Sequence, residues 1–261
     1  MKLAISGKGG TGKTTLAGIL THLFRKDGYE VLAVDADPDA NLAAAIGVPP
    51  EWQRKIQPIS AQRQLIKERT GANPREFGQL FKLNPTVSDI PDDFCINFRG
   101  IKLLVMGAVQ KGGEGCACPE NVLLKSLLSE IILHRNEVVI VDMEAGIEHL
   151  GRSTAESIDK MMICIEPGSR SIETARAIIK LGKEIGLYDF GIVGNKIRNK
   201  NQEEWIGKQF DAEMLSGFIP YSETIQEADI QQKSLFEVME KSLSAAFQHI
   251  YQKLLSTEDT M

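Results

Sequence analysis

Residues 2–15 read Lys2-Leu3-Ala4-Ile5-Ser6-Gly7-Lys8-Gly9-Gly10-Thr11-Gly12-Lys13-Thr14-Thr15, an apolar strand pattern followed by a glycine-rich loop. Glycine tolerates positive φ and leaves backbone N–H groups uncovered, so such a loop can donate several hydrogen bonds to one anion. A helix that starts near Lys13 adds the positive end of its dipole. The pattern G-x-x-x-x-G-K-[ST] in this setting predicts a polyphosphate-binding P-loop rather than a glycine-rich turn without a ligand.

The positions within this loop have distinct expected roles. Lys13 supplies a cation for the terminal phosphates, the Thr14 hydroxyl can ligate Mg²⁺, and Thr15 is expected to reach the α-phosphate. The expected nucleotide contacts of the loop are Lys8, Gly9, Gly10, Thr11, Gly12, Lys13, Thr14 and Thr15.

Lys8 is not required by the phosphates of its own chain, because Lys13 already serves them, and a lone lysine is by default a solvated surface charge. The string K-G-G-T-G-K-T-T, however, resembles the deviant P-loop of division-site ATPases, plasmid-partition ATPases and the nitrogenase iron protein. The resemblance runs over nearly the whole chain. It implies an ATPase that hydrolyses ATP to ADP and phosphate as a homodimer, in which Lys8 crosses the interface to the partner's nucleotide.

Composition sets broader bounds. A chain of 261 residues with 43% apolar content can bury one substantial core, so we expect one domain, residues 1–261. The net charge of −5 and pI of 5.5 argue against nucleic acid as a partner. No apolar run approaches the ~20 residues of a membrane span, and the strand pattern at the N-terminus leaves no room for a signal peptide. Together with four cysteines typical of a reducing compartment, this predicts a cytoplasmic protein without membrane attachment.

Short apolar runs alternate with helical patterns along the chain, which indicates parallel βαβ units. The predicted fold class is α/β, a doubly wound, mostly parallel sheet with helices on both faces. The expected strands are 2–6, 30–35, 101–106, 138–142, 161–165, 191–195 and 215–219, and the expected helices 13–26, 121–135, 172–185, 201–210 and 236–255. A polar, proline-containing stretch at about 48–100 is expected to be an insertion with short helices.

The carboxyl ends of these strands carry acidic residues, and ligands of doubly wound sheets lie at those ends. The second strand runs into Asp35-Ala36-Asp37-Pro38-Asp39-Ala40-Asn41. An acidic turn is the simpler interpretation, but carboxylates at alternate positions beside phosphates need a compensating cation. The D-x-D-P string resembles switch I of the same ATPases, which implies that Asp37 positions the attacking water. Asn41 stands where some of them carry another aspartate.

A second acidic strand end is Val138-Val139-Ile140-Val141-Asp142, the Walker B arrangement. Asp142 is expected to hold Mg²⁺ together with Thr14. Residues 143–149 then resemble switch II, with Gly146 as a candidate hinge. Glu144 either tunes the site or is an exposed structural acid.

Base recognition is predicted from Asn195, whose amide can both donate to and accept from an adenine edge, although a helix-capping asparagine is the alternative. The resemblance implies adenine contacts by Asn195 and by the loop at Pro220. No N-K-x-D guanine signature is present, so ATP is preferred over GTP.

Cysteines at 116 and 118 form a C-x-C pair in Gly112-Gly113-Glu114-Gly115-Cys116-Ala117-Cys118-Pro119. Two thiolates cannot complete a tetrahedral site, but two copies facing each other across a dimer would supply four sulfur ligands for Ni²⁺ or Zn²⁺. The alternative is a pair of semi-buried thiols without a ligand. Cys95 and Cys164 are expected to be core cysteines.

The motifs together resemble the accessory ATPases that insert nickel into carbon monoxide dehydrogenase. This resemblance implies a metallochaperone with the catalytic subunit of that dehydrogenase as its client. G-x-G-C also resembles the cluster loop of the nitrogenase iron protein, but His149 stands where that protein has its second cluster cysteine. An iron–sulfur redox ATPase therefore stays open as the alternative.

Two further classes are less compatible with the sequence. A membrane-positioning ATPase needs a basic amphipathic tail, whereas the C-terminal apolar stripe, from Phe247 to Leu255, ends in acidic residues and fits a core-packing helix better. A scaffold that binds nucleotide without hydrolysis does not fit the pair Asp37 and Asp142.

Overall fold

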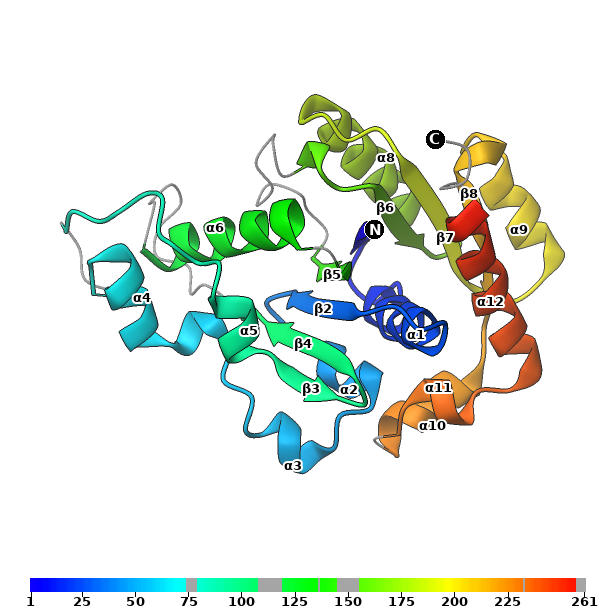
Figure 1. The fold of residues 1–261 in the computed structure, drawn as a ribbon. Coiled ribbons are helices and arrows are strands. Elements are labelled where there is room, and N and C mark those ends of the chain that lie inside the picture. The colour runs from blue at the N-terminus through cyan, green and yellow to red at the C-terminus, as the bar shows by residue number, and fades with distance from the viewer. Residues whose placement is uncertain (74–78, 108–118, 136, 145–154, 232, 257–261) are drawn as a thin grey trace.

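The computed structural model describes residues 1–73, 79–107, 119–135, 137–144, 155–231 and 233–256, and Figure 1 shows their arrangement. One sheet runs through the molecule. Its strands are β1 (Lys2–Ser6), β2 (Val31–Ala36), β3 (Ile96–Phe98), β4 (Ile101–Val105), β5 (Val138–Met143), β6 (Lys160–Ile165), β7 (Phe190–Ile197) and β8 (Leu215–Pro220).

The strand order is β3-β4-β2-β5-β1-β6-β7-β8, with β1 near the centre. Every neighbouring pair is parallel except β3 and β4. Strands β2, β4 and β5 lie on one side of β1 and strands β6, β7 and β8 on the other, so the chain winds outward in both directions from the strand that precedes the P-loop. The predicted doubly wound, mostly parallel sheet is confirmed. The short antiparallel β3 was not predicted, because three residues give too little pattern to identify a strand.

Helices cover both faces. The elements are α1 (Lys13–Lys26), α2 (Leu42–Ile46), α3 (Pro50–Gln53), the 3₁₀ turn η1 (Ile59–Ala61), α4 (Arg63–Thr70), α5 (Ile90–Phe94), α6 (Pro119–His134), α8 (Ser169–Glu184), α9 (Lys200–Gly207), η2 (Ala212–Met214), α10 (Glu223–Ile230), α11 (Leu235–Val238) and α12 (Lys241–Ser256). One core lies between the sheet and α4, α6, α8 and α9, and the other between the sheet and α1, α2, α11 and α12. Alternate residues of β2 point into these two cores, which is why its sequence is apolar from Val31 to Val34.

The predicted insertion at 48–100 does contain short helices, but its apolar residues belong to the core. Ile59, Ile66 and Ile90 are fully buried in the cluster that also contains residues of α6. In Figure 1, α4 lies beside α6, and these two helices are in contact. The insertion therefore covers the outer part of one sheet face.

The C-terminal region differs from the prediction of one helix over 236–255. The chain forms α11 and then α12, with Met239 leaving helical geometry between them. Helix α10 was not predicted, and α9 ends at Gly207 rather than at 210. The core-packing interpretation of the last helix is confirmed, because Phe247, Ile250 and Leu254 are buried. Within the residues that the structure describes, no helix combines the length and hydropathy needed to span a membrane.

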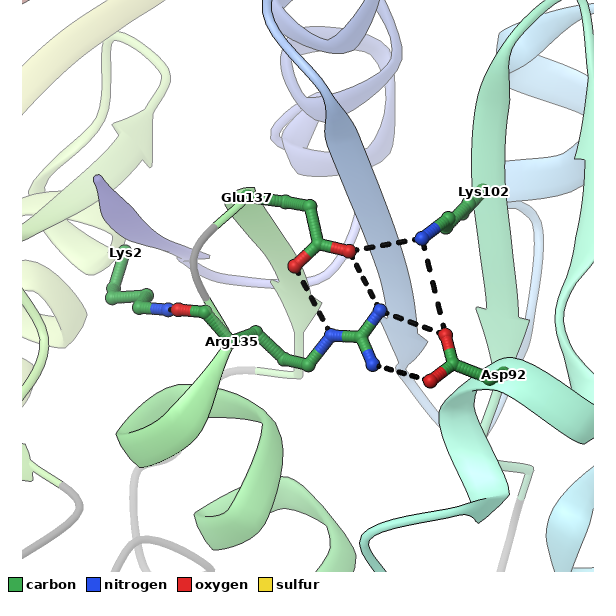
Figure 2. Close-up of polar contacts among 5 residues, drawn as sticks. All are labelled: Lys2, Asp92, Lys102, Arg135 and Glu137. Atoms are coloured by element: carbon green, nitrogen blue, oxygen red, sulfur yellow. Dashed lines mark hydrogen bonds and ion pairs between the residues drawn. The ribbon is translucent and has the colours of Figure 1, made fainter.

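An ionic cluster lies at the amino ends of the strands, at the end of the sheet opposite the P-loop (Figure 2). The Arg135 guanidinium lies between two carboxylates and donates to Asp92 of α5 at 2.9 Å and to Glu137 at 2.6 Å. Lys102 of β4 donates to Glu137 at 3.0 Å, and Lys2 of β1 donates to the Arg135 carbonyl. The cluster thus ties the insertion and the end of α6 to the amino ends of the strands.

Candidate nucleotide site

The loop after β1 folds back on itself as its sequence predicts. The Thr11 N–H and hydroxyl both donate to the Lys8 carbonyl, at 3.2 and 2.8 Å. Gly10 and Gly12 have φ of 79° and 92°, in the left-handed region that favours glycine. Gly7 needs to lack a side chain, because a Cβ there would lie 2.3 Å from the Cys164 carbonyl oxygen. The glycines are therefore required by the shape of the loop.

Helix α1 starts at Lys13, at the predicted residue. Its N-cap is Gly12, and no side chain caps the helix. The first N–H groups of any α-helix have no partner within the helix, and here the positive end of the dipole opens toward the loop. Loop and helix start together form an anion site of the kind that holds polyphosphates.

Lys13 and Asp37 meet at this site. The Lys13 ammonium lies 3.7 Å from Oδ2 of Asp37, and the side chains are 8% and 17% exposed. The prediction that the D-x-D-P turn lies beside the phosphate site rested on strand-end geometry, and the structure does bring the two residues together. A carboxylate here faces the cation that serves the terminal phosphates.

Asp35 holds the loop that carries Asp37. Its carboxylate accepts the Leu42 N–H at 2.8 Å and the Asp37 N–H at 3.3 Å, so it closes the turn between β2 and α2. Burial raises the pKa of Asp35 to about 6, although these two hydrogen bonds oppose the shift. Asn41 is exposed and donates to the Asp39 carbonyl at 2.8 Å. In this structure Asn41 shapes the turn.

Asp142 lies near the carboxyl end of β5, directly beside Asp35, with which it is paired in the register of β2 and β5. It is completely buried, and neither carboxylate oxygen has a hydrogen-bond partner among the described residues. Burial raises the pKa of Asp142 to about 7. The nearby Thr14 hydroxyl and Lys13 ammonium oppose this shift, while Asp35 and Asp37 add to it.

A buried carboxylate without partners is costly unless a cation compensates it. Mg²⁺ prefers oxygen ligands and commonly binds P-loop proteins through one carboxylate and one hydroxyl. Asp142 and Thr14 supply this donor set beside the anion site. The residues present therefore fit the predicted Mg²⁺.

Asn195 lies next to the P-loop, near the carboxyl end of β7. It is 4% exposed, and its Nδ2 donates to the Thr11 carbonyl at 2.7 Å. Its Oδ1 accepts the N–H of Lys196 at 2.8 Å. This contact also explains Gly12, because a Cβ there would lie 2.2 Å from Nδ2 of Asn195. The helix-capping alternative does not describe this contact, and an adenine contact by Asn195 stays a prediction.

Pro220 ends β8, the edge strand next to β7. The following residue, Tyr221, donates its N–H to the Ile197 carbonyl at 2.8 Å, and the Arg198 guanidinium lies 3.7 Å from the centre of the Tyr221 ring. The loop is therefore held against the end of β7. Its predicted contact with adenine stays a prediction.

Other predicted positions are distributed as follows. Lys8 and Gly9 lie in the partly exposed part of the loop, and within the described residues the Lys8 ammonium has no ion-pair partner. Glu144 is exposed, in line with the structural interpretation of that acid. Cys164 is a core cysteine as predicted, whereas Cys95 is only half-buried against the core.

The C-x-C pair, Cys116 and Cys118, and the switch II residues Gly146 and His149 lie outside the described residues. In the part of the chain that is described, no group of three or more His, Cys, Asp or Glu side chains is arranged to hold a metal ion. The predicted metal site across a dimer stays a prediction.

Two residues of this site were missed by the sequence analysis. The sequence pattern shows Asp35 as one acid in a run of acids, and nothing in it indicates that Asp35 closes the turn. Lys196 was not considered, although it follows Asn195 and donates to the Gly10 carbonyl at 2.7 Å. The position of Lys196 directly after Asn195, near a predicted strand end, is the signal that could have identified it.

Comparisons with known proteins agree with this geometry. Residues 2–235 match the family model of the CobQ/CobB/MinD/ParA nucleotide binding domain. The chain is 48% identical to the carbon monoxide dehydrogenase accessory protein CooC of Rhodospirillum rubrum, covering 88% of this chain and 87% of that protein. It is 45% identical to an uncharacterized ATP-binding protein of Methanocaldococcus jannaschii, covering 90% and 91%.

Among solved structures, a ParA family ATPase from Chlorobium tepidum superposes with a TM-score of 0.68 at 19% identity, over 97% of this chain and 98% of that one. This likeness confirms the fold that the sequence predicted. The loop geometry, the extent of the family match and the sequence identities lead to one conclusion: the chain belongs to the CobQ/CobB/MinD/ParA family of nucleotide-binding P-loop proteins, as a CooC-like ATPase of the MinD/ParA class.

Proposed function

We propose that this protein is an ATP-hydrolysing homodimer that delivers nickel to the catalytic subunit of carbon monoxide dehydrogenase. The observation that supports ATP hydrolysis most directly is the ion pair of Lys13 and Asp37 beside the P-loop. Near this pair lies the buried carboxylate of Asp142, which has no hydrogen-bond partner among the described residues. The client is proposed from the 48% identity to the CooC protein of Rhodospirillum rubrum. The proposed setting is the cytoplasm, where the thiols stay reduced.

Each residue of the site has a proposed task in hydrolysis. The loop N–H groups and the start of α1 bind the phosphates, and Lys13 neutralises the terminal ones. Asp37 orients the attacking water and accepts its proton. Asp142 and Thr14 would hold Mg²⁺, which neutralises phosphate charge when bound. Lys8 is proposed to reach the partner's nucleotide, so that ATP draws two chains together.

The cargo would be held by Cys116 and Cys118 of both chains. Four thiolates suit Ni²⁺ or Zn²⁺ in this proposal. Since thiolates must be deprotonated to bind metal, the affinity should fall in acid. Hydrolysis would release the phosphate contacts, separate the two chains and free the metal for the client.

The first experiment is an anaerobic titration of the reduced protein with nickel, zinc and iron, in the presence and absence of ADP or ATP. One nickel per dimer, lost in a Cys116→Ser, Cys118→Ser double variant and kept in Cys95→Ser, supports delivery. Iron with sulfide would favour the redox ATPase instead. Unchanged nickel binding in the double variant contradicts the proposed cargo site.

The dimer is tested separately with Lys8→Ala. We expect this variant to bind nucleotide as a monomer and to lose ATP-dependent dimerisation in light scattering. Lys26→Ala, which removes an exposed lysine at the far end of α1, is the matched control. Tight ATP-dependent dimers of Lys8→Ala with full ATPase activity would refute the role of Lys8.

A further inference from the structure

Lys196 has a backbone conformation that lysine rarely adopts. Its φ is 59°, and among the described residues only Arg99 is another non-glycine residue with positive φ. Such a conformation is strained for a residue other than glycine and persists where the surroundings impose it, often at functional sites. Lys196 is the exposed residue between the buried Asn195 and Ile197 near the end of β7, so contacts at that strand end impose this geometry.

The side chain of Lys196 makes two contacts. Its ammonium donates to the carbonyl oxygen of Gly10 in the P-loop at 2.7 Å and to Oε2 of Glu166 at 3.1 Å. Glu166 follows β6, and its own N–H donates to the Ser171 hydroxyl of α8 at 3.1 Å. The ammonium is therefore anchored by the loop between β6 and α8 while it holds the P-loop.

Lys196 acts next to Asn195, whose amide donates to the Thr11 carbonyl. Two consecutive residues thus hold two consecutive P-loop carbonyls. In a trans peptide the C=O and N–H bonds point in opposite directions. Because Asn195 fixes the direction of the Thr11 carbonyl, the Gly12 N–H points to the opposite side, on which α1 begins. Holding the Gly10 carbonyl fixes the peptide whose N–H closes the turn onto Lys8.

We propose that Lys196 is a positioning residue of the phosphate-binding loop, with Glu166 as its anchor. The ammonium orients the Gly10–Thr11 peptide and keeps the loop in the shape that binds phosphate. The positive φ directs the side chain back toward the loop. The inference rests on the proposed binding of nucleotide at the P-loop and is independent of nickel delivery.

A positioning role and a direct contact with the nucleotide make different predictions. A loop that loses its shape binds ADP and ATP less well by the same factor, because the α- and β-phosphates are common to both. An ammonium that touches the γ-phosphate would affect ATP alone. A purely structural role would lower the melting temperature of the nucleotide-free protein and leave the affinity of the folded protein for both nucleotides unchanged.

The experiment compares Lys196→Asn and Lys196→Ala. Asparagine tolerates the left-handed conformation but cannot reach Gly10. Alanine neither favours that conformation nor has a group that can bond to Gly10. The control is Lys200→Ala, which removes an exposed lysine at the start of α9. Affinities for Mg-ADP and for a non-hydrolysable Mg-ATP analogue are measured by calorimetry, with kcat, KM and the melting temperature of each variant.

We expect both Lys196 variants to weaken ADP and the ATP analogue about tenfold, as expected for the loss of a charge-assisted hydrogen bond that orders a loop. KM should rise in parallel, kcat should stay within about threefold, and the melting temperature of Lys196→Asn should be close to that of the control. Glu166→Gln should weaken binding less and should add little in the Lys196→Asn background, because the two residues act as one unit.

Normal ADP binding by Lys196→Asn would overturn the inference, and so would a loss confined to the ATP analogue. If the unaltered protein does not bind ADP, both the proposed function and this inference are refuted. Normal binding by the unaltered protein and by both variants leaves the proposed function in place and refutes only the role of Lys196.

Discussion

Lys13 at the start of α1 and Asp37 after β2 form an ion pair with 3.7 Å between Nζ and Oδ2, at the mouth of the P-loop. The pair joins two segments that would flank the terminal phosphate. A phosphate group that binds Lys13 must compete with this carboxylate for the ammonium. The pair therefore relates nucleotide binding to the position of the carboxylate that is proposed as the general base.

Asp37→Asn should separate binding from hydrolysis. The change keeps the shape of the side chain but removes the proton acceptor and the competing charge. We expect phosphate release to fall by about a hundredfold or more, as for loss of a general base, with unchanged or tighter ATP binding. Asp39→Asn, at an exposed carboxylate two residues on, is the control and should hydrolyse ATP normally. Equal rates for the two variants would exclude the proposed role of Asp37.

Asp142→Asn should improve stability while it abolishes Mg²⁺-dependent activity. The substitution removes a buried carboxylate that has no hydrogen-bond partner among the described residues. In buffer with EDTA, the free energy of unfolding in urea should rise by about 1 kcal/mol. Mg²⁺-dependent phosphate release should be lost. Glu144→Gln, at an exposed neighbouring carboxylate, should change neither quantity, and a less stable Asp142→Asn would argue against an uncompensated charge.

Gly12→Ala should destabilise the protein more than Gly9→Ala. A Cβ at Gly12 would lie 2.2 Å from Nδ2 of Asn195 on a backbone with φ of 92°, whereas a Cβ at Gly9 meets nothing within 4 Å. Left-handed strain and the collision together should cost about 2–3 kcal/mol at Gly12. Urea denaturation of both variants checks this, and similar midpoints would contradict the observed packing of Asn195 beneath the loop.

The ionic cluster in Figure 2 should make stability depend on pH through Glu137. Burial alone would raise the pKa of Glu137, but hydrogen bonds from Arg135 and Lys102 outweigh it and lower the pKa from 4.5 to about 2. A depressed folded-state pKa contributes stability that is present above the unfolded pKa and is lost as pH falls through the folded pKa.

The window for this loss is therefore about pH 5 to 2, and the cluster should contribute roughly 1–2 kcal/mol at pH 7 after screening. Glu137→Gln should be less stable at pH 7 and should lose less stability on acidification than the unaltered protein. The free energy of urea unfolding at several pH values tests this. Glu184→Gln, at an exposed carboxylate of α8, should follow the unaltered protein, and parallel curves for all three would rule out the contribution.

Much of the site could be predicted because its chemistry is local in the sequence. The P-loop contains its glycines, Lys13 and Thr14 within a few residues, and the predicted helix 13–26 has the bounds of α1. Asp37 and Asp142 could be placed near it from one rule, that parallel strands end at the same edge of the sheet. The C-x-C motif was also visible, although its structure lies outside the described residues.

Other features depend on which strands become neighbours, and no local pattern gives that. Lys196 contacts Gly10 only because β6 pairs with β1 and β7 pairs with the other side of β6, which places the end of β7 near the loop that follows β1. The burial of the insertion could not be predicted, because each of its short helices contributes few apolar side chains among prolines and polar residues. The ionic cluster joins Asp92, Arg135 and Glu137 across elements that have no common sequence signal.

The sequence by itself determined the phosphate-binding loop, the doubly wound parallel sheet and the acids at its strand ends, because backbone freedom of glycine and apolar periodicity are local properties. Only the tertiary structure decided that Asp142 is buried without a partner among the described residues, that Asp35 closes the turn of Asp37, and that Asn195 and Lys196 hold the P-loop from below. These are contacts between distant segments, and their geometry follows from strand order and packing rather than from spacing along the chain.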